Sequence, residues 1–316
     1  MDQDPLKINK IQIVFIGFFL AVFIISKIFL TSEKKEAFVM EILPIDPFAS
    51  VLIDAKSAYV FDITTNTSLF SKNEELQLPL ASVTKIMTAA VASEIVPKET
   101  IVHINKEAIS KEGDTGLLSG ERWKLADLLD LTLVVSSNDG AAAIAAALGN
   151  LYKIPNVETI NNNEENDSEK SFVALMNEAA LSLGMAQTFF LNESGLDVTE
   201  SISGAYSSAK DMAILFDYIL KTNSEILSAT RYSEISLSSI DDILHKVKNT
   251  NESIGAIPAL IASKTGFTDL AGGNLVVAFE AGPMRPIIVS VLGSGINTRF
   301  SDVENLVWAS IEKIAK

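Results

Sequence analysis

Ser82 and Lys85 lie three residues apart in the stretch LPLASVTKIMTAA, residues 78–90. Three residues is close to one helical turn, so both side chains project from the same face of a helix. A serine hydroxyl becomes a nucleophile when a neighbouring amine can accept its proton. Pro79 ends an extended segment before an apolar helix, which places Ser82 near unpaired helix N-terminal N–H groups. The pair indicates nucleophilic catalysis, and a helix-capping serine is the alternative.

The spacing S-x-x-K is not specific alone, because it recurs at Ser32–Lys35 and at Ser207–Lys210. Two further motifs follow along the chain. Ser136-Ser137-Asn138 forms a polar kink between two helical patterns in VVSSNDGAAA, and Lys264-Thr265-Gly266 ends an apolar strand pattern in IASKTGFTDLAGG. Their order and their contexts together are hard to obtain by chance.

The trio S-x-x-K, S-x-N and K-T-G is the signature of class A β-lactamases and penicillin-binding proteins. Over about residues 45–316 the chain resembles the low-molecular-mass penicillin-binding proteins, the serine D-alanyl-D-alanine carboxypeptidases. The stretches LLSGERWKLADLLDLTLVVSSNDGAAAIA, FVALMNEAALSLGM, TFFLNESGLD, AYSSAKDMAIL and KTGFTDLAGGNLVVAF share the resemblance, in the family's order. It implies an α+β, penicillin-binding/β-lactamase-like fold: an antiparallel sheet flanked by helices, a helical subdomain, and an active site between them.

The resemblance implies a catalytic role for five side chains. Ser82 is the expected nucleophile, and Lys85, kept neutral by burial and nearby cations, is its proton acceptor. Lys264 supplies such a cation. Ser136 is expected to relay the proton to the leaving amine, and Asn138 to hold Lys85 and the substrate backbone.

Substrate binding is expected at four further residues. The N–H groups of Phe267 and of the nucleophile form the implied oxyanion hole, next to Gly266 of the K-T-G motif. Thr265 and Arg299 are expected to bind the terminal carboxylate of the substrate. Arg285 is the competing arginine. The alternative reading of Arg299 is a surface arginine paired with Asp302 or Glu304.

Composition excludes several other functions. The 316-residue chain has no cysteine, only two histidines and a formal net charge of −15. A disulfide framework, thiolate chemistry and a His-rich metal site are therefore not expected, and nucleic-acid binding lacks its basic footprint. No metal or cofactor is expected. The implied partners are peptidoglycan stem peptides ending in D-Ala-D-Ala, with β-lactams as inhibitors.

The N-terminus carries an apolar stretch, residues 11–30, interrupted only by Ser26 and Lys27. About twenty helical residues match the hydrocarbon thickness of a bilayer, so the stretch predicts a transmembrane anchor, with a cleaved signal sequence as the alternative. The expected domains are an anchor at 1–30, a linker at 31–47 and a serine peptidase domain at 48–316. The expected location is the bacterial cytoplasmic membrane, single-pass, with the catalytic domain outside the cytoplasm.

Hydrophobic periodicity predicts mixed α/β structure after the linker. A hairpin or meander with β-rich runs at Val51–Ile53 and Ala58–Ile63 comes first, and a helical region follows. The predicted helices are Ile86–Ala92, Leu125–Val135, Ala141–Leu148, Phe172–Leu183, Ala209–Leu220 and Val303–Ile314. The later predicted strands are Ala259–Ser263, Asn274–Ala281 and Pro286–Leu292. The acidic, Asn-rich residues 160–170 are predicted to be a surface loop.

Three alternatives to a carboxypeptidase share some of these features. A peptidoglycan DD-endopeptidase or transpeptidase uses the same residues. A class A β-lactamase also needs a deacylating glutamate in an E-x-x-L-N context, and FLNESGLD resembles the carboxypeptidases instead. A non-catalytic wall-binding module is less consistent with a complete set of catalytic residue types.

Overall fold

The computed structural model describes residues 9–30, 46–113, 115–149, 151 and 164–316. The chain divides into two compact units, Met1–Ile45 and Asp46–Lys316. The first contains the helix α1 (Lys10–Leu30), and the second contains every residue of the three motifs.

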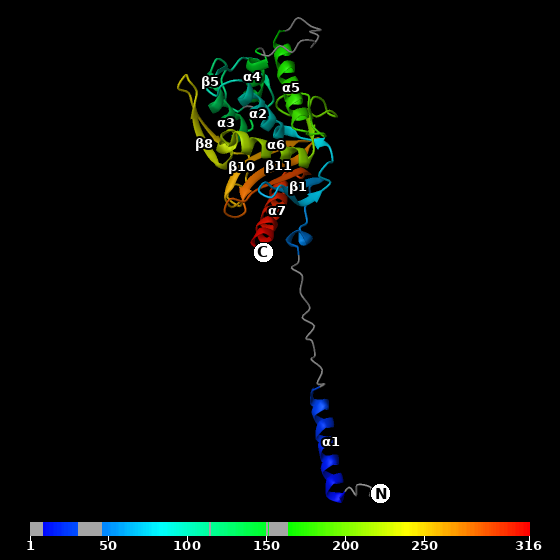
Figure 1. The fold of residues 1–316 in the computed structure, drawn as a ribbon. Coiled ribbons are helices and arrows are strands. Elements are labelled where there is room, and N and C mark those ends of the chain that lie inside the picture. The colour runs from blue at the N-terminus through cyan, green and yellow to red at the C-terminus, as the bar shows by residue number, and fades with distance from the viewer. Residues whose placement is uncertain (1–8, 31–45, 114, 150, 152–163) are drawn as a thin grey trace. The chain divides into compact units, whose positions relative to one another are not determined.

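A five-stranded antiparallel sheet forms the centre of the second unit (Figure 1). Its spatial order is β10-β11-β12-β1-β2. The strands are β1 (Ser57–Asp62), β2 (Thr67–Lys72), β10 (Leu260–Thr268), β11 (Gly272–Glu280) and β12 (Pro286–Ser294). Because β1 pairs with β12, with Ser57 opposite Leu292, the two ends of this unit build one sheet. The antiparallel sheet of the expected fold is confirmed, and K-T-G lies on its edge strand β10.

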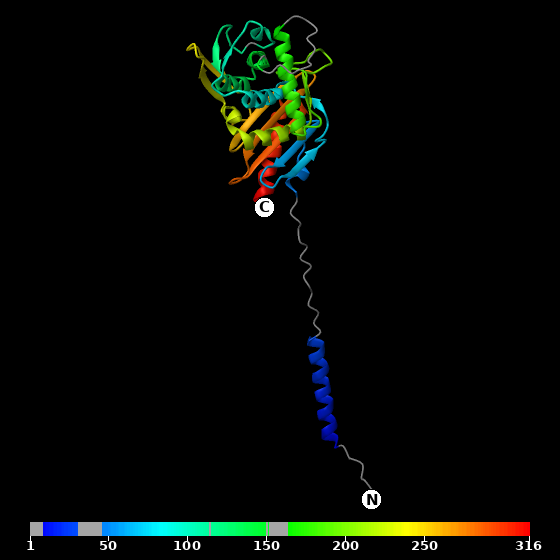
Figure 2. The same ribbon diagram turned by 45° about the horizontal axis from the view of Figure 1, so that its top comes forward.

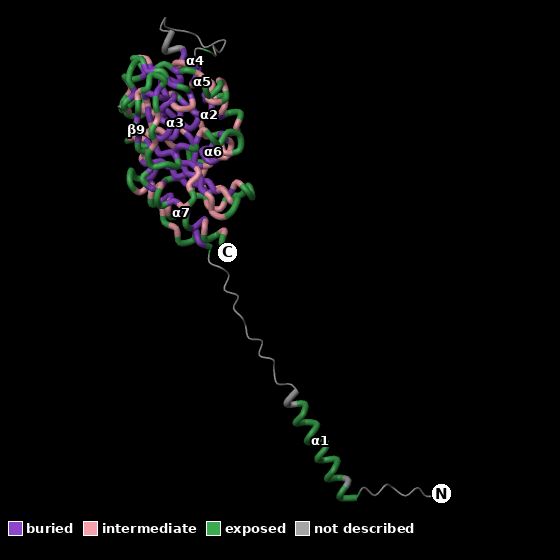
Figure 3. Tube along the Cα trace, turned by 90° about the vertical axis from the view of Figure 1, so that its left-hand side faces the viewer, coloured by how far each residue is buried: buried purple, intermediate pink, exposed green. Residues whose placement is uncertain are grey.

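Side chains alternate along the central strands between two hydrophobic cores, as the pleat of a strand requires. On β11, Val276 and Ala278 face the helical region, whereas Val277 and Phe279 belong to the core beneath α7 (Thr298–Ala315). Figure 2 shows the sheet between these layers, and Figure 3 shows the buried residues gathered in the interior of this unit. Both faces of the sheet are therefore covered.

The helical region lies between β2 and β10 in the chain. Its helices are α2 (Lys85–Ile95), α3 (Leu125–Val134), α4 (Asn138–Gly149), α5 (Glu164–Ser182) and α6 (Ala209–Thr222). Short 3₁₀ helices join them: η2 (Ala81–Thr84), η3 (Ala108–Ser110) and η4 (Ser224–Arg231), with η1 (Pro47–Ser50) before the sheet. Each predicted helix corresponds to one of these α-helices or to α7, because its apolar positions recur at the helical period.

Two predicted elements are wrong. Val51–Ile53 is irregular, and the hairpin partner of β1 is instead β2. The predicted loop at 160–170 is helical from residue 164, where α5 begins, and residues 160–163 lie outside the described residues. A helix can begin in an acidic segment because carboxylates are favourable near the positive end of the helix dipole.

Several small strands were not predicted. They are β3 (Leu78–Pro79), β4 (Ile101–His103), β5 (Arg122–Lys124), β6 (Phe189–Phe190), β7 (Ala205–Ser207), β8 (Glu234–Ser238) and β9 (Leu244–Lys248). They form a β3-β7-β6 sheet and the pairs β4-β5 and β8-β9. The strands of two or three residues are too short to carry a period that a sequence can reveal. The five-residue strands β8 and β9 do alternate in burial, and the sequence analysis did not predict them.

The predicted N-terminal helix is present as α1, and its described large side chains are exposed and apolar, such as Phe15, Phe19 and Phe23. In the described part of the chain, no helix reaches the combination of length and apolarity that crossing a membrane requires. The predicted membrane span is therefore not confirmed.

Asn274 of β11 fastens the sheet to the segment that leads into η2. Its fully buried side chain donates to the carbonyl groups of Pro79 and Leu80, at 3.0 and 2.9 Å, and accepts from the N–H of Gly293 at 2.7 Å. One amide thus satisfies three buried backbone groups from two other segments, which fixes where the Ser82 turn lies against the sheet.

We expect Asn274→Ala to lower the free energy of unfolding by about 2–4 kcal/mol, because it removes three hydrogen bonds that the Asn274 amide makes to backbone groups. Urea unfolding followed by circular dichroism measures the change. Asn305→Ala on the exposed side of α7 is the matched control and should change stability by less than about 0.5 kcal/mol. Equal stabilities of the two variants would contradict the fastening role.

Candidate active site

Ser82 lies in the single turn of η2, and Lys85 is the first residue of α2. The turn is opened by Ala81, whose φ of 49° lies in the left-handed region that a residue with a β-carbon rarely adopts. Thr84 closes the turn by donating from Oγ1 to the carbonyl of Ala81 at 2.7 Å. The sequence therefore turns sharply from β3 into a helix and presents both side chains of S-x-x-K together.

Lys85 Nζ lies at the centre of the site. It donates to Asn138 Oδ1 at 2.6 Å and to the carbonyl of Ser194 at 2.8 Å, and it lies 2.8 Å from Ser82 Oγ. A neutral amine has two N–H groups and one lone pair, and the first two partners can only accept. The lone pair of a neutral Lys85 therefore faces the hydroxyl of Ser82, which is the arrangement that proton abstraction needs.

Burial favours this neutral form. Lys85 has no exposed surface, and burial lowers its pKa from 10.5 to about 7, while the charge of Glu193 raises it. The charged form is disfavoured because an ammonium loses its hydration inside the protein. At neutral pH a large fraction of Lys85 can therefore accept a proton.

Ser136-Ser137-Asn138 is the tight link between α3 and α4. Ser136 has a φ of 65°, and Ser137 caps α4 by accepting the N–H of Gly140 at 2.9 Å. Asn138 opens α4 and also donates from Nδ2 to the carbonyl of Glu112 at 2.6 Å. The kink that the sequence indicates thus turns Ser136 and Asn138 in the direction of the two lysines.

Lys264 connects the sheet to this link. Its Nζ donates to Ser136 Oγ at 2.9 Å and to the carbonyl of Thr265 at 2.8 Å. Burial lowers the pKa of Lys264, and the charges of Lys85 and Arg299 lower it further. The Oγ1 of Thr265 forms a short hydrogen bond with that of Thr250. The structure brings together Ser82, Lys85, Ser136, Asn138 and Lys264.

Gly266 allows β10 to approach the Ser82 turn. A β-carbon at this position would lie 2.8 Å from the carbonyl oxygen of Leu80 and 3.1 Å from the nitrogen of Ser82. Any larger residue would push the edge strand away from the turn. Gly266 thus brings the backbone of β10, including the next residue Phe267, beside the N–H of Ser82.

Arg299, at the start of α7, points back to β10. Its Nη1 donates to the carbonyl of Gly266 at 2.9 Å, its side chain is largely buried, and its Nε has no partner among the described residues. The alternative pairing is wrong, because Asp302 accepts from the N–H groups of Asp54 and Ala55 and Glu304 accepts from Ser253.

The competing Arg285 lies at the opposite end of β12. It forms an ion pair with the fully buried Asp62, with Nη2 at 2.6 Å and Nε at 2.9 Å from Oδ2. Arg285 precedes β12 and Arg299 follows it, so the nine-residue strand separates them. Arg285 is therefore not part of the site.

Several groups of the site were not predicted. The carbonyls of Ser194 and Glu112 are backbone acceptors, for which no side-chain motif exists. Thr250 and Glu193 also lie beside predicted residues. The stretch FLNESGLD, which contains Glu193 and Ser194, resembles the family. That resemblance predicted no role for either residue.

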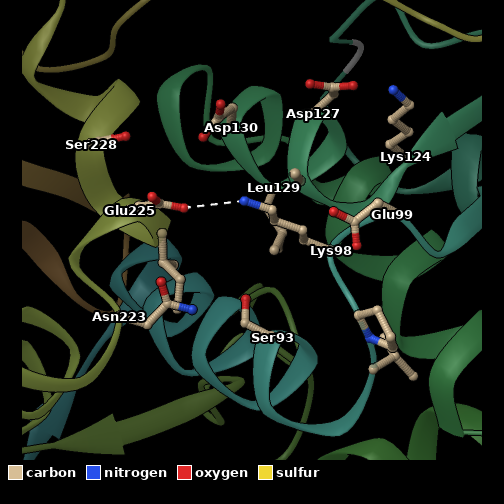
Figure 4. A pocket seen from close by; sticks show the side chains of 14 residues that line it. Ser93, Lys98, Glu99, Lys124, Asp127, Leu129, Asp130, Asn223, Glu225 and Ser228 are labelled. Atoms are coloured by element: carbon tan, nitrogen blue, oxygen red, sulfur yellow. Dashed lines mark hydrogen bonds and ion pairs between the residues drawn. The ribbon is translucent and has the colours of Figure 1, made fainter.

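A hollow of about 660 Å³ opens elsewhere, among the end of α2, the start of α3 and η4 (Figure 4). Asp130 lines it, and burial together with the charge of Asp127 raises the pKa of Asp130 to about 6. None of the predicted site residues lines this hollow. Within the described ranges, no group of three or more His, Cys, Asp or Glu side chains is placed to hold a metal ion.

A family model described as D-alanyl-D-alanine carboxypeptidase matches residues 46–295, most of the chain. The chain belongs to this peptidase S11 family. The family membership expected from the three motifs is thereby confirmed. The match includes all the predicted catalytic residues and ends before Arg299.

Two curated relatives illustrate the range of the family. D-alanyl-D-alanine carboxypeptidase DacF of Bacillus subtilis is 33% identical over 75% of this chain and 57% of its own length. A D-alanyl-D-alanine endopeptidase of Haemophilus influenzae is 32% identical over 77% of this chain and 74% of its own length. The chain thus spans a little over half the length of the carboxypeptidase relative.

The fold is shared with solved structures. The Streptomyces K15 DD-transpeptidase superposes with a TM-score of 0.72 at 24% identity, covering 83% of this chain and 98% of that one. A D-alanyl-D-alanine carboxypeptidase from Mycobacterium tuberculosis gives a TM-score of 0.71 at 22% identity, covering 84% of this chain and 95% of that one. The penicillin-binding fold expected from the sequence is confirmed.

Proposed function

We propose that this chain is a serine D-alanyl-D-alanine carboxypeptidase, which removes the terminal D-Ala of peptidoglycan stem peptides through an acyl-enzyme and is acylated by penicillin. The supporting observation is the buried Lys85 amine 2.8 Å from the hydroxyl of Ser82, with its two other partners able only to accept. This geometry gives the serine its base, and the family gives the substrate class.

Acylation begins when Ser82 attacks the carbonyl of the penultimate D-Ala and Lys85 takes its proton. The N–H groups of Ser82 and Phe267 stabilise the oxyanion, and one such donor is typically worth roughly 10²–10³ in rate. Ser136, held by Lys264, relays the proton from Lys85 to the amine of the departing D-Ala, so that Lys85 is neutral again. Water then attacks the acyl-enzyme, Lys85 accepts the proton of the water and returns it to the Ser82 oxygen as the acyl bond breaks.

Recognition of the chain end is assigned to Thr265 and Arg299. A guanidinium can meet both oxygens of a carboxylate with parallel hydrogen bonds. The buried Nε of Arg299, without a partner among the described residues, is a donor suited to a ligand. Gly273 leaves room for this side chain, because a β-carbon there would lie 3.1 Å from Arg299 Cδ.

Ser82→Ala should abolish covalent labelling by fluorescent penicillin, because among the described residues Ser82 carries the only hydroxyl in hydrogen-bond contact with Lys85 Nζ. Gel fluorescence and mass mapping of the adduct measure this. Ser207→Ala, which removes the serine of another S-x-x-K, is the control and should still be labelled. Its hydroxyl bonds to Thr188 and its motif partner Lys210 pairs with Glu75.

Persistent labelling of the Ser82 variant would overturn the assignment. Product analysis on a pentapeptide and on a cross-linked dimer then separates carboxypeptidase from endopeptidase or transpeptidase action. Rapid, repeated hydrolysis of penicillin would instead make the protein a β-lactamase.

Arg299→Ala should lower kcat/KM for a D-Ala-D-Ala peptide by roughly 10–10³-fold, since a hydrogen bond to a charged group is worth about 1.5–3 kcal/mol and stranding its partner costs more. Steady-state kinetics on a matched peptide with an amidated terminus provide the comparison. The wild type should process the amide poorly, and the substitution should change it little. Equal losses on both peptides would show that Arg299 acts on the fold only.

The finer location of the protein is part of the proposal: attachment to the outer face of the cytoplasmic membrane through α1. The exposed apolar side chains of α1 support it, because such a surface is unfavourable in water. Replacing Phe15, Phe19 and Phe23 together by lysine should release the protein from the membrane fraction. Leu52→Lys, at an exposed leucine of the second unit, is the control and should not.

Carbonate extraction and protease treatment of spheroplasts measure attachment and sidedness separately. Recovery of the wild-type chain in the soluble fraction, or protection of its second unit from external protease, would contradict the proposal.

A further inference from the structure

Glu193 is a buried carboxyl group that the mechanism above does not use. The residue is only 3% exposed and follows β6, directly before Ser194. No described side chain donates a hydrogen bond to its carboxylate. A buried carboxyl group without such a donor is costly unless a nearby positive charge compensates it.

The loop that carries Glu193 is fastened at three points, two on α2 and one on η2. Thr88, three residues after Lys85, donates from Oγ1 to the carbonyl of Glu193 at 2.6 Å. The next carbonyl, of Ser194, accepts from Lys85 Nζ. Gly195 packs so tightly on the carbonyl of Ala81 that a β-carbon would clash with it. Glu193 is thus held beside the base rather than at the surface.

Other charged groups lie near Glu193 and Lys85. Lys264 of β10 is a second buried lysine close to Lys85. Lys111, which follows η3, forms an ion pair at 3.3 Å with Glu169 of α5, and both affect Glu193. The charge of Glu193 raises the pKa of Lys85 against the effect of burial. Burial raises the pKa of Glu193, and the charge of Glu169 adds to this. A hydrogen bond from the backbone N–H of Glu193 and the charges of Lys111 and Lys85 oppose it.

The site needs such an anion because its chemistry creates a cation. Lys85, Lys264 and Arg299 are all largely buried and come from three different elements. When Lys85 takes the Ser82 proton, a new positive charge forms close to the other two, where the effective dielectric constant is low. A carboxylate close to Lys85 offsets this repulsion.

We propose that Glu193 is a positioning residue that stabilises the ammonium form of Lys85 and so makes this buried amine a strong enough base for Ser82. The inference rests on the proposed function for its kinetic test only. Removing the charge of Glu193 should make Lys85 lose its proton at lower pH, and it should also make neutral Lys85 a weaker base. The first effect moves the pH dependence of the rate, and the second lowers the rate at high pH.

The kinetic test is the pH dependence of penicillin acylation from about pH 5 to about pH 9 on the full chain. In the wild type, the rate should rise with pH through about 7, as Lys85 loses its proton. Glu193→Gln should move this rise in rate to lower pH. The rate at about pH 6 divided by the rate at about pH 8 should then increase roughly 3–5-fold, which is the change for a pKa shift near one unit. The plateau should fall roughly 3–30-fold because the base is weaker.

Two control variants separate charge from packing. Glu193→Asp keeps the charge and should keep the rise of the rate near its wild-type pH, and Glu178→Gln removes an exposed carboxylate of α5 and should leave the rise and the plateau unchanged. The proposal would be overturned if the rise in rate occurred at the same pH in Glu193→Gln as in the wild type. It would also be overturned if the Gln and Asp variants lost equal plateau rate without any change in the pH of the rise.

A direct titration keeps the inference independent of the proposed function. NMR of ¹³C-labelled lysine, with the Lys85 signal identified by its loss in Lys85→Arg, reports the charge of Lys85 whether or not the protein turns over a peptide. The signal should titrate at lower pH in Glu193→Gln than in the wild type. Identical titrations would overturn the role of Glu193, whereas absence of acylation in a wild type with shifted titrations would overturn the proposed function alone.

Discussion

The chemistry of the site depends on the burial of the Lys85 amine away from water. Lys85 sits at the first position of α2 with no exposed surface, and its nitrogen is held by three partners from η2, α4 and the loop after β6. Each partner belongs to an element that is itself fixed by packing. The helical region therefore shields the Lys85 amine from water and directs it at the hydroxyl of Ser82.

The sheet supplies what the helical region lacks. Lys264 and the backbone of β10 approach the site from the edge of the five-stranded sheet, and Gly266 lets the strand come within contact of the Ser82 turn. Asn274 sets that distance by joining β11 to the residues just before the turn. Because the side chains of the site come from both halves, a displacement of the sheet edge relative to the Ser82 turn changes the site directly.

The sequence predicted the elements whose signal is periodic or local. Long helices such as α6 and α7 and the strands β11 and β12 follow from apolar periodicity, and the three motifs predicted side chains that the structure brings together. The left-handed conformations of Ala81 and Ser136 were not predictable, since residues with a β-carbon rarely adopt them. The direction of Arg299 also depends on non-local packing against Gly273, and the carbonyl of Ser194 carries no side-chain signature.

The position of β1 between β12 and β2 has a consequence for how the chain acquires activity. The N–H of Ala55 bonds to Asp302 across 247 residues, and β1 gains its second neighbour only when β12 is present. Closing so long a loop costs entropy before any contact rewards it, so this pairing belongs to the slow end of folding. The helical region, whose contacts are nearer in sequence, can collapse earlier, but without β10 and α7 it holds a serine and an amine and lacks Lys264 and Arg299. Under the proposed function, a partly synthesised chain therefore lacks part of the site, and activity requires nearly all of the second unit.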